Sequence, residues 1–272
     1  MKEETKSKIK LKHLKKDARA PKLAKKNFNK LSKTKKSFKF KEFNVKYLFI
    51  FLIISILLKG YDSDSYITLK IDGIGSFNVF GPNDTFTKPD VVYINGNKKD
   101  IVNNTYNFNE TNNIIELIWN NGVINCANMF MGCSNIKEIN LSNFDTCKVE
   151  KMDSMFKGCS ALEKLILTNF NTSKVKDMSN MFDGCSSLSY LNLSSFDTSK
   201  VTYMNHMFTG CSKLSFLNLS NFDTSKVEKI NFMFKGCSNL TSLDLSNFDT
   251  SKVKFMHDLF EDCYSLTSLN IS

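Results

Sequence analysis

Residues 185–210 read CSSLSYLNLSSFDTSKVTYMNHMFTG, and closely similar 26-residue stretches precede and follow them. One cysteine and one phenylalanine mark the period in every copy. The cysteines are Cys133, Cys159, Cys185, Cys211, Cys237 and Cys263, and the phenylalanines are Phe130, Phe156, Phe182, Phe208, Phe234 and Phe260. A fixed period of this length is typical of a solenoid, in which stacked repeats share one continuous core.

The first part of each copy predicts a strand. In residues 188–193, LSYLNL, the leucines would face the core, while Tyr190 and Asn192 would point to the opposite side. A polar turn, SFDTS at 195–199, follows, and its Asp, Thr and Ser are residues that commonly cap helix N-termini. The strand is therefore expected to lead through this turn into a second element.

The second element is predicted to be a short helix. Its apolar residues recur at intervals of 3, 3, 1 and 3, which is typical of one helical face, and Gly210 would end it. These residues are Val201, Met204, Met207, Phe208 and Cys211. The predicted fold is an α/β solenoid, a leucine-rich-repeat-like stack of 26-residue strand–turn–short-helix repeats over residues 126–272.

The sequences of the repeats resemble those of one protein family. Residues 128–149, NMFMGCSNIKEINLSNFDTCKV, and 232–253, FMFKGCSNLTSLDLSNFDTSKV, are similar to repeats of the BspA-like leucine-rich repeat surface proteins, which read MFxGCSxLxxLxLSxFDTSxVxxM. The resemblance covers residues 126–272. It implies a solenoid displayed at a cell surface, with adhesion or recognition roles, and it implies neither enzymatic activity nor a cofactor.

The residue pattern of 61–125 is typical of a small antiparallel β unit. The apolar runs at 67–71, 91–94 and 114–119 each meet an Asp-Gly or an Asn-Gly-type turn, which indicates strands joined by tight turns. A solenoid needs a cap over its first coil, so this segment is predicted to be an N-terminal β cap. A separate ligand-binding β domain is the alternative, although about 65 residues would give it only a marginal core.

The N-terminal arm carries the basic charge of the chain. Residues 1–46 hold 18 Lys and Arg against 4 Asp and Glu, a net +14, whereas the whole chain carries +10, so the remainder carries −4. This composition predicts a disordered arm, either simply solvated or in contact with an anionic membrane surface. A nucleic-acid partner is not expected, because an apolar run follows directly.

The apolar run at residues 47–58, YLFIFLIISILL, contains no charged residue. As a helix it would span only about 18 Å, but flanking lysines that snorkel would extend it. Residues 47–60 are predicted to be an uncleaved transmembrane signal anchor, with a signal-peptide h-region as the alternative. Since positive residues stay inside, the arm would be cytoplasmic and the repeats extracellular in a single-pass membrane protein, or secreted if the run is cleaved.

The outer side of the predicted strands is the candidate binding face. Its mid-stack positions combine apolar or aromatic residues with amides and one acid, a mixture that marks interaction sites. The candidates are Ile166, Tyr190, Asn192, Phe216, Asn218 and Asp244. The expected partner is an extracellular protein or carbohydrate. The alternatives are neutral drift of an unused surface, or cover by attached sugars.

Sugars could be attached at sequons, which recur along the predicted extracellular part. The candidate glycosylation sites are Asn83, Asn103, Asn109, Asn140, Asn192, Asn218 and Asn270, and Asn171 and Asn239 carry the same pattern. Four of the candidates, Asn140, Asn192, Asn218 and Asn270, fall on the candidate binding face itself.

The cysteines and acidic residues admit two interpretations each. The six-cysteine column is expected to be a reduced packing ladder, whereas Cys126 and Cys147 break the pattern and form the candidate disulfide. An acidic column could bind calcium, but one carboxylate per coil is better explained as a turn or helix cap. That column is Asp145, Asp197, Asp223 and Asp249. Spacing of 26 residues offers no zinc site.

The sequence therefore predicts a non-catalytic, membrane-anchored surface protein for adhesion or recognition. No phosphate-binding loop, zinc motif or nucleophile elbow occurs in it, and the histidines are scattered. The alternative is a structural protein that assembles end to end through its last coil, which would leave apolar surface and a strand edge uncovered.

Overall fold

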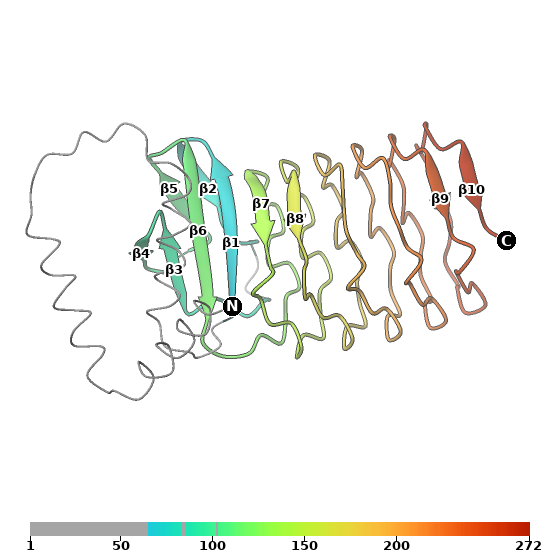
Figure 1. Ribbon diagram of the computed structural model, residues 1–272, viewed down its shortest axis with the longest axis horizontal. Helices are drawn as coiled ribbons and strands as arrows, with labels where there is room; N and C mark the ends of the chain where they lie inside the picture. The colour runs from blue at the N-terminus through green and yellow to red at the C-terminus, as the bar shows by residue number, and fades with distance from the viewer. Residues whose placement is uncertain (1–64, 83–84, 102) are drawn as a thin grey trace, which may run out of the picture. The chain divides into compact units, whose positions relative to one another are not determined.

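The computed structural model describes residues 65–82, 85–101 and 103–272, which belong to one compact unit, Ser63–Ser272 (Figure 1). The basic arm at 1–46, the apolar run at 47–60 and the candidate glycosylation site Asn83 lie outside the described residues. Within the described ranges, no helix is long and apolar enough to cross a membrane.

The described residues form ten strands in three sheets. A six-stranded sheet has the order β4-β3-β6-β1-β7-β8, and two further pairs are β2-β5 and β9-β10. The bounds are β1 Ser65–Asp72, β2 Gly75–Asn78, β3 Val91–Ile94, β4 Asn97–Lys99, β5 Thr105–Phe108, β6 Asn112–Trp119, β7 Ile136–Asn140, β8 Lys164–Ile166, β9 Ser242–Asp244 and β10 Ser268–Asn270.

The three strands predicted before the repeats are present as β1, β3 and β6, and they pair antiparallel. The β3–β4 hairpin turns through Asn95 and Gly96, which both have positive φ angles, 49° and 76°, as a tight Asn-Gly turn requires. Strand β1 also pairs with β7 of the first repeat, antiparallel, from Thr68 to Ile71. The strand edge of the first repeat is therefore covered by the segment that precedes it (Figure 1).

A second contact joins this segment to the repeats. The Trp119 side chain, at the end of β6, is 1% exposed. Its ring centroid lies 5.0 Å from that of Phe144, and its Nε1 donates a hydrogen bond of 2.9 Å to the carbonyl of Thr87. Phe144 belongs to the column that continues with Phe170, Phe196 and Phe222, so Trp119 forms the first rung of that column.

The 26-residue repeats stack as coils in a single row, as the period predicts (Figure 1). We number them coil 1 (125–150), coil 2 (151–176), coil 3 (177–202), coil 4 (203–228), coil 5 (229–254) and coil 6 (255–272). The phenylalanine column from Phe130 to Phe260 forms a continuous ladder, with neighbouring ring centroids 5.6–5.9 Å apart and nearly parallel rings. The cysteine and leucine columns lie beside this ladder in one buried core.

The predicted short helix is wrong. Residues 205–210 form consecutive turns after a parallel bridge at Tyr203, and no helix occurs anywhere in the described part of the chain. Within this segment His206 and Gly210 have φ angles of 59° and 68°, in the left-handed region that interrupts a right-handed helix. The misleading three-residue spacing has another cause, because Met207 and Cys211 each bond to the carbonyl three residues earlier, as β-turns do.

Candidate functional site

Each coil has a turn side, residues 203–211 in coil 4 and their equivalents, where hydrogen bonds join it continuously to the next coil. Backbone N–H groups of alternate residues from Met204 to Gly210 donate to carbonyls of coil 5 at 2.7–3.0 Å. The same alternation recurs in coils 1 to 5. The residues with left-handed φ angles make this alternation possible, because they direct every second N–H toward the next coil. The turn side thus acts as a hydrogen-bonded spine.

A buried threonine column strengthens the connection at the corner after the strand. The Thr198 hydroxyl donates to the carbonyl of Asp223 at 2.9 Å and accepts the N–H of the same residue at 2.8 Å. Thr172 and Thr224 repeat this arrangement with the next coil. Thr198 is only 1% exposed, so these two bonds satisfy a hydroxyl that is buried together with the part-buried backbone groups of the next coil.

The acidic column serves the same corner. The carboxylate of Asp197 accepts the backbone N–H of Ser199 at 3.0 Å, and the hydroxyl and N–H of Ser199 lower the pKa of Asp197. The equivalent residues in coils 1, 2, 4 and 5 accept the same backbone bond. Each acid therefore caps its own turn, and the described residues contain no group of acidic, histidine and cysteine side chains placed to hold a metal ion.

The strand side, residues 215–219 in coil 4 and their equivalents, is joined differently. Strands β7 and β8 pair at one end of the row, and β9 and β10 pair at the other. Between them, in coils 2 to 5, the described residues make no backbone hydrogen bond from one strand segment to the next. Side chains bridge the gap instead, because the amide of Asn221 donates to the carbonyl of Leu193 at 3.1 Å and Asn247 donates to Leu219 at 3.0 Å.

The ring spacing agrees with this opening. Between coils 3 and 4, the centroids of Phe196 and Phe222 on the strand side lie 6.5 Å apart, compared with 5.7 Å for Phe182 and Phe208 on the turn side. These two coils therefore lie slightly farther apart on the strand side, whereas Phe170 and Phe196, one coil earlier, are 5.8 Å apart. The core leucines lie beneath this opening and remain buried, Leu191 and Leu217 at 4% exposure each.

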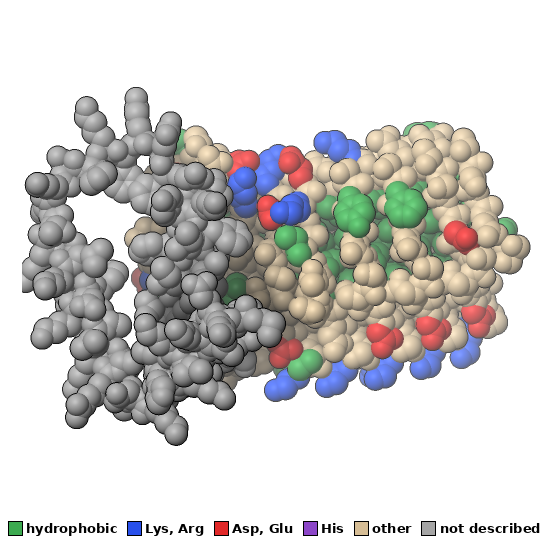
Figure 2. All heavy atoms as spheres, in the orientation of Figure 1, with side chains coloured by type: hydrophobic (Ala, Val, Ile, Leu, Met, Phe, Trp, Pro, Cys, Tyr) green, Lys and Arg blue, Asp and Glu red, His purple; other side chains and the backbone are tan. Residues whose placement is uncertain are grey.

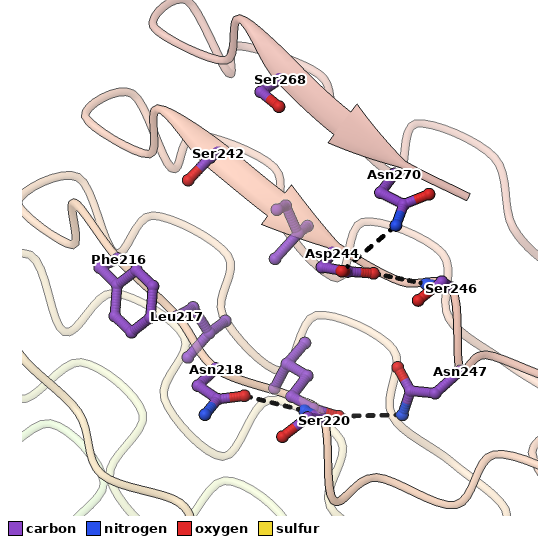
Figure 3. Close-up of a pocket in the computed structure, with 12 residues that line it drawn as sticks. Phe216, Leu217, Asn218, Ser220, Ser242, Asp244, Ser246, Asn247, Ser268 and Asn270 are labelled. Carbon is purple, nitrogen blue, oxygen red and sulfur yellow. Dashed lines mark hydrogen bonds between the residues drawn. The ribbon is translucent and has the colours of Figure 1, made fainter. Parts of the chain in front are cut away.

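A crevice of about 500 Å³ opens on the strand side across coils 4, 5 and 6 (Figure 3). Phe216 lies at one side, and Asn218 and Ser220 follow it along coil 4. Asp244 of β9 and Asn270 of β10 lie across from them, joined by a hydrogen bond of 3.2 Å between the Asn270 amide and the Asp244 carboxylate. The crevice therefore combines an aromatic ring with amides, hydroxyls and one acid.

The structure brings three of the six candidate binding residues, Phe216, Asn218 and Asp244, to the lining of this crevice. Tyr190 and Phe216 are both strongly exposed, at 65% and 58%. Tyr190, Asn192 and Ile166 occupy the equivalent positions of coils 3 and 2, outside the lining, and Ile166 is half-buried. Figure 2 shows hydrophobic side chains gathered in the middle of the row of coils on this face.

The charge of the crevice is set by Asp244. Hydrogen bonds from the hydroxyl and N–H of Ser246, and then from the Asn270 amide, lower the pKa of this carboxyl, so it is ionised at neutral pH. No other charged side chain lines the crevice in the described structure. Farther along the face, Lys164 and Glu138 neutralise each other in an ion pair of 2.8 Å. The crevice thus carries a single negative charge.

Three lining residues lie after the strand and were not among the predicted candidates. Ser220, Ser246 and Asn247 belong to the polar LSN tripeptides that follow the strand segments of coils 4 and 5. Sequence reasoning treated this stretch only as a turn. The recurrence of a polar pair directly after the last strand leucine is the signal that would have extended the candidate face to include them.

The candidate disulfide is not formed. Cys126 is fully buried, whereas Cys147 is exposed and its Sγ lies 3.4 Å from the carboxylate of Asp145. All eight cysteines are free thiols. From Cys159 to Cys263, each ladder cysteine donates to a phenylalanine carbonyl of the preceding coil at 3.0–3.2 Å, and burial raises the pKa of these thiols. The column is therefore a reduced packing ladder without thiolate character.

The described candidate glycosylation sites divide between two regions. Asn103 and Asn109 are exposed in the segment before the repeats, whereas Asn140, Asn192, Asn218 and Asn270 lie on the strand side. In Asn192 and Asn218 the side-chain oxygen accepts the N–H of the serine two residues later, at 3.0 Å. This bond uses only the oxygen, so the Nδ2 group that would carry a sugar is not engaged by it.

Comparison with known proteins places the repeats in a family. The family model described as "Mycoplasma protein of unknown function, DUF285" matches residues 124–216 and 189–272, which together make up more than half of the 272 residues. Neither a curated protein nor a solved structure was found to match. The match spans all six coils and with them the strand side and its crevice. The chain belongs to the family of Mycoplasma proteins of unknown function called DUF285.

Proposed function

We propose that this chain is a cell-surface protein, anchored in the membrane through residues 47–60, that recognises an extracellular ligand with the strand side of its coils. The proposed role is adhesion or recognition without catalysis. One observation is the main support for this recognition role. In residues 125–254, all of which the structure describes, Tyr190 and Phe216 are the only large hydrophobic side chains that are strongly exposed, and they occupy the same position in neighbouring coils.

Exposure of two aromatic side chains at equivalent positions is unfavourable in water unless a partner covers them. Aromatic residues are enriched among the side chains that contribute most to binding. Apolar patches bordered by polar residues mark interaction surfaces more often than single exposed side chains do. Here the neighbours are Asn192, Asn218 and Asp244, so the patch has the mixed border expected of a recognition surface.

The proposed location rests on the sequence. The basic arm followed by the apolar run at 47–58 supports a signal anchor with the repeats outside the cell. The resemblance of the repeats to BspA-like surface proteins supports the same extracellular location, and the sequons are consistent with it. A secreted form, released by cleavage of the apolar run, would use the same face.

The test is the topology of the tagged full chain in its own cells. One tag is placed before Met1 and another after Ser272, and each is probed with antibody on intact and on permeabilised cells. We expect the C-terminal tag to be visible on intact cells and the N-terminal tag only after permeabilisation. A mature protein without the N-terminal tag would indicate secretion, and two internal tags would contradict the surface role.

End-to-end assembly fits the arrangement of strands less well. Head-to-tail stacking would require an open strand edge on coil 1, and that edge is already paired with β1. Sedimentation of the purified chain over a range of concentrations tests this alternative. A concentration-dependent shift to regular multimers would favour assembly over the proposed recognition role.

A further inference from the structure

We propose that the crevice beside Phe216 binds a neutral oligosaccharide, with one sugar ring lying on the Phe216 ring and its hydroxyls paired with Asn218, Asp244 and Asn270. This inference rests on the proposed recognition role of the strand side and specifies its ligand. It goes beyond that role because it assigns the ligand's chemistry, the crevice that holds it and the contribution of each side chain.

The aromatic side provides the first element of such a site. Phe216 is 58% exposed and borders the crevice, so one ring face is available to an apolar surface (Figure 3). The axial C–H groups of a hexose form an apolar surface of this kind. Tyr190 occupies the equivalent position one coil earlier and would extend the platform for a second sugar, since adjacent coils follow at about the 4.8 Å spacing of strands.

The polar side provides hydrogen-bonding groups that are not used up within the protein. The Asn218 oxygen accepts the N–H of Ser220 at 3.0 Å, which leaves both Nδ2 protons to donate. The hydroxyls of Ser242 and Ser268 make no hydrogen bond in the part of the chain that the structure describes. A carboxylate accepts up to about four hydrogen bonds, so Asp244 retains capacity beyond Ser246 and Asn270.

This set of groups matches vicinal hydroxyls. Each hydroxyl of a sugar donates one hydrogen bond and accepts others, so it pairs with a carboxylate on one side and with an amide N–H on the other. Asp244 is held in place by its bonds to Ser246 and Asn270, which orients the carboxylate before a ligand arrives. A site oriented in advance loses less conformational entropy on binding.

The charge distribution excludes anionic ligands. Asp244 is the single charged side chain of the described lining, and it is negative. A sialylated, sulfated or phosphorylated ligand would bring like charge against this carboxylate without any lysine or arginine in the crevice to offset it. An uncharged ligand meets no such penalty, so the crevice favours neutral sugars.

The spacing of the coils excludes an inserted peptide strand. A strand that paired with both neighbours would need its flanking backbones about 9.5 Å apart, twice the distance between paired strands. At the crevice, coils 5 and 6 pair directly through β9 and β10, and the Asn247 amide of coil 5 donates to the Leu219 carbonyl of coil 4 at 3.0 Å, so the coils have opened by far less than a strand's width. A ligand therefore lies on the face instead of between the coils.

The test uses the purified full chain and saturation-transfer difference NMR. The probes are linear neutral oligomers of glucose, galactose, mannose and N-acetylglucosamine, together with sialylated and sulfated oligosaccharides. We expect transfer to the ring protons of at least one neutral oligomer and none to the charged ones. Titration of the best neutral probe then gives the dissociation constant for the variants.

The variants separate the crevice from the rest of the surface. Phe216→Ala is expected to weaken binding by roughly tenfold or more, as loss of a central aromatic contact does. Asp244→Asn, which keeps the shape but not the charge or full acceptor capacity, is expected to weaken binding several-fold. The control is Tyr264→Ala, a more exposed aromatic outside the crevice, which should leave the dissociation constant unchanged. Thermal melting checks that each variant is folded.

Three results would overturn the assignment: no neutral probe binds, the charged probes bind as well, or Phe216→Ala binds like the unaltered chain. The proposed function is judged separately, by the topology of the tags and by attachment of cells to immobilised protein or carbohydrate. If the repeats are displayed and Phe216→Ala reduces attachment to protein while no neutral sugar binds, the recognition role stands and the sugar assignment fails.

Discussion

The turn side and the strand side of the coils are built from the same repeat but are held together in opposite ways. On the turn side, every second N–H from Met204 to Gly210 bonds to the next coil. On the strand side, the junctions from coil 2 to coil 3, from coil 3 to coil 4 and from coil 4 to coil 5 have no such backbone bonds in the described structure, and side chains such as Asn221 bridge instead. One side forms the spine of the stack and the other is open.

This division separates the residues that hold the stack together from those that are free to vary. The columns of the spine keep phenylalanine, cysteine and glycine through almost every coil, because the ladder requires them. The outer strand column differs in nearly every coil, and it reads Glu138, Lys164, Tyr190, Phe216, Ser242 and Ser268. A side that contributes few inter-coil bonds can change its residues without weakening the stack, and such a side is suited to acquire a ligand.

The largest contrast should appear in hydrogen exchange of the backbone amides. We expect the amides of Met204, His206, Phe208 and Gly210 to exchange only by global unfolding, which costs about 5–15 kcal/mol for a typical domain. The amides of residues 190–193 should exchange by local opening, with a free energy near zero. Leu245, on the strand side but bonded to Asn270, is the internal control and should be protected. Equal protection of both sides would remove the distinction.

The next largest effect compares two phenylalanines. Phe182→Ala removes a fully buried rung of the ladder and should lower the free energy of unfolding by about 3–5 kcal/mol. Phe216→Ala removes an exposed ring and should change it by no more than about 0.5 kcal/mol. Urea denaturation followed by circular dichroism measures both. Similar losses would mean that the strand side also stabilises the stack.

The threonine column gives a smaller loss. Thr198→Val keeps the volume but leaves the N–H and carbonyl of Asp223 without the part-buried bonds that the Thr198 hydroxyl makes to them, at a cost of about 1–3 kcal/mol. Ser199→Ala, one residue later and less buried, is the comparison variant and should cost less, about 0.5–1 kcal/mol, because it removes only the hydroxyl bond to the exposed carboxylate of Asp197. The same denaturation experiment applies, and a neutral Thr198→Val would show that water reaches this corner.

The smallest effect is on pH dependence. The hydroxyl and N–H of Ser225 lower the pKa of Asp223 from its ordinary value of 3.8. The stabilisation is therefore fully present above pH 3.8 and is lost as the pH falls through the lower pKa of the folded state. Asp223→Asn should melt at a similar temperature at pH 7 and lose less on acidification. Asn171, which caps the same turn in coil 2, shows that an amide can replace the acid.

The melting temperatures of both proteins are measured from pH 7 down to about pH 2. The exposed carboxylate makes the expected difference small, because solvent screens its interactions. Curves that stay parallel over the whole range would show that this carboxylate does not contribute to acid sensitivity.

The stack itself could be predicted from the sequence, because each repeated phenylalanine, cysteine and leucine must find the same surroundings in the next coil. The strands before the repeats were predictable for a different reason, since residues 67–71 alternate and Asn95-Gly96 permits only a narrow choice of turn. The helix was mispredicted because consecutive turns bring residues together every three positions, as a helix nearly does. The left-handed φ angles at His206 and Gly210 separate the two, and histidine at position 206 gives no sequence signal of such an angle.

The candidate site could be predicted in part. Alternation along the strand places Tyr190, Phe216 and Asp244 on the outer side, and the structure places them there. The crevice could not be foreseen, because it depends on strand segments that separate in the middle of the row and pair at both ends. That difference lies in the inter-coil hydrogen bonds, which cannot be inferred from the closely similar sequences of the repeats.

Trp119 gives the molecule an optical reporter at one defined place. It is the only tryptophan of the chain, and its ring lies 5.0 Å from Phe144, where the segment before the repeats meets coil 1. Its fluorescence therefore reports on that junction alone, whereas circular dichroism reports on all coils together. If unfolding begins at the far coils and travels along the row, the dichroism signal will change before the tryptophan emission does, and the interval between them will measure how cooperatively the coils unfold.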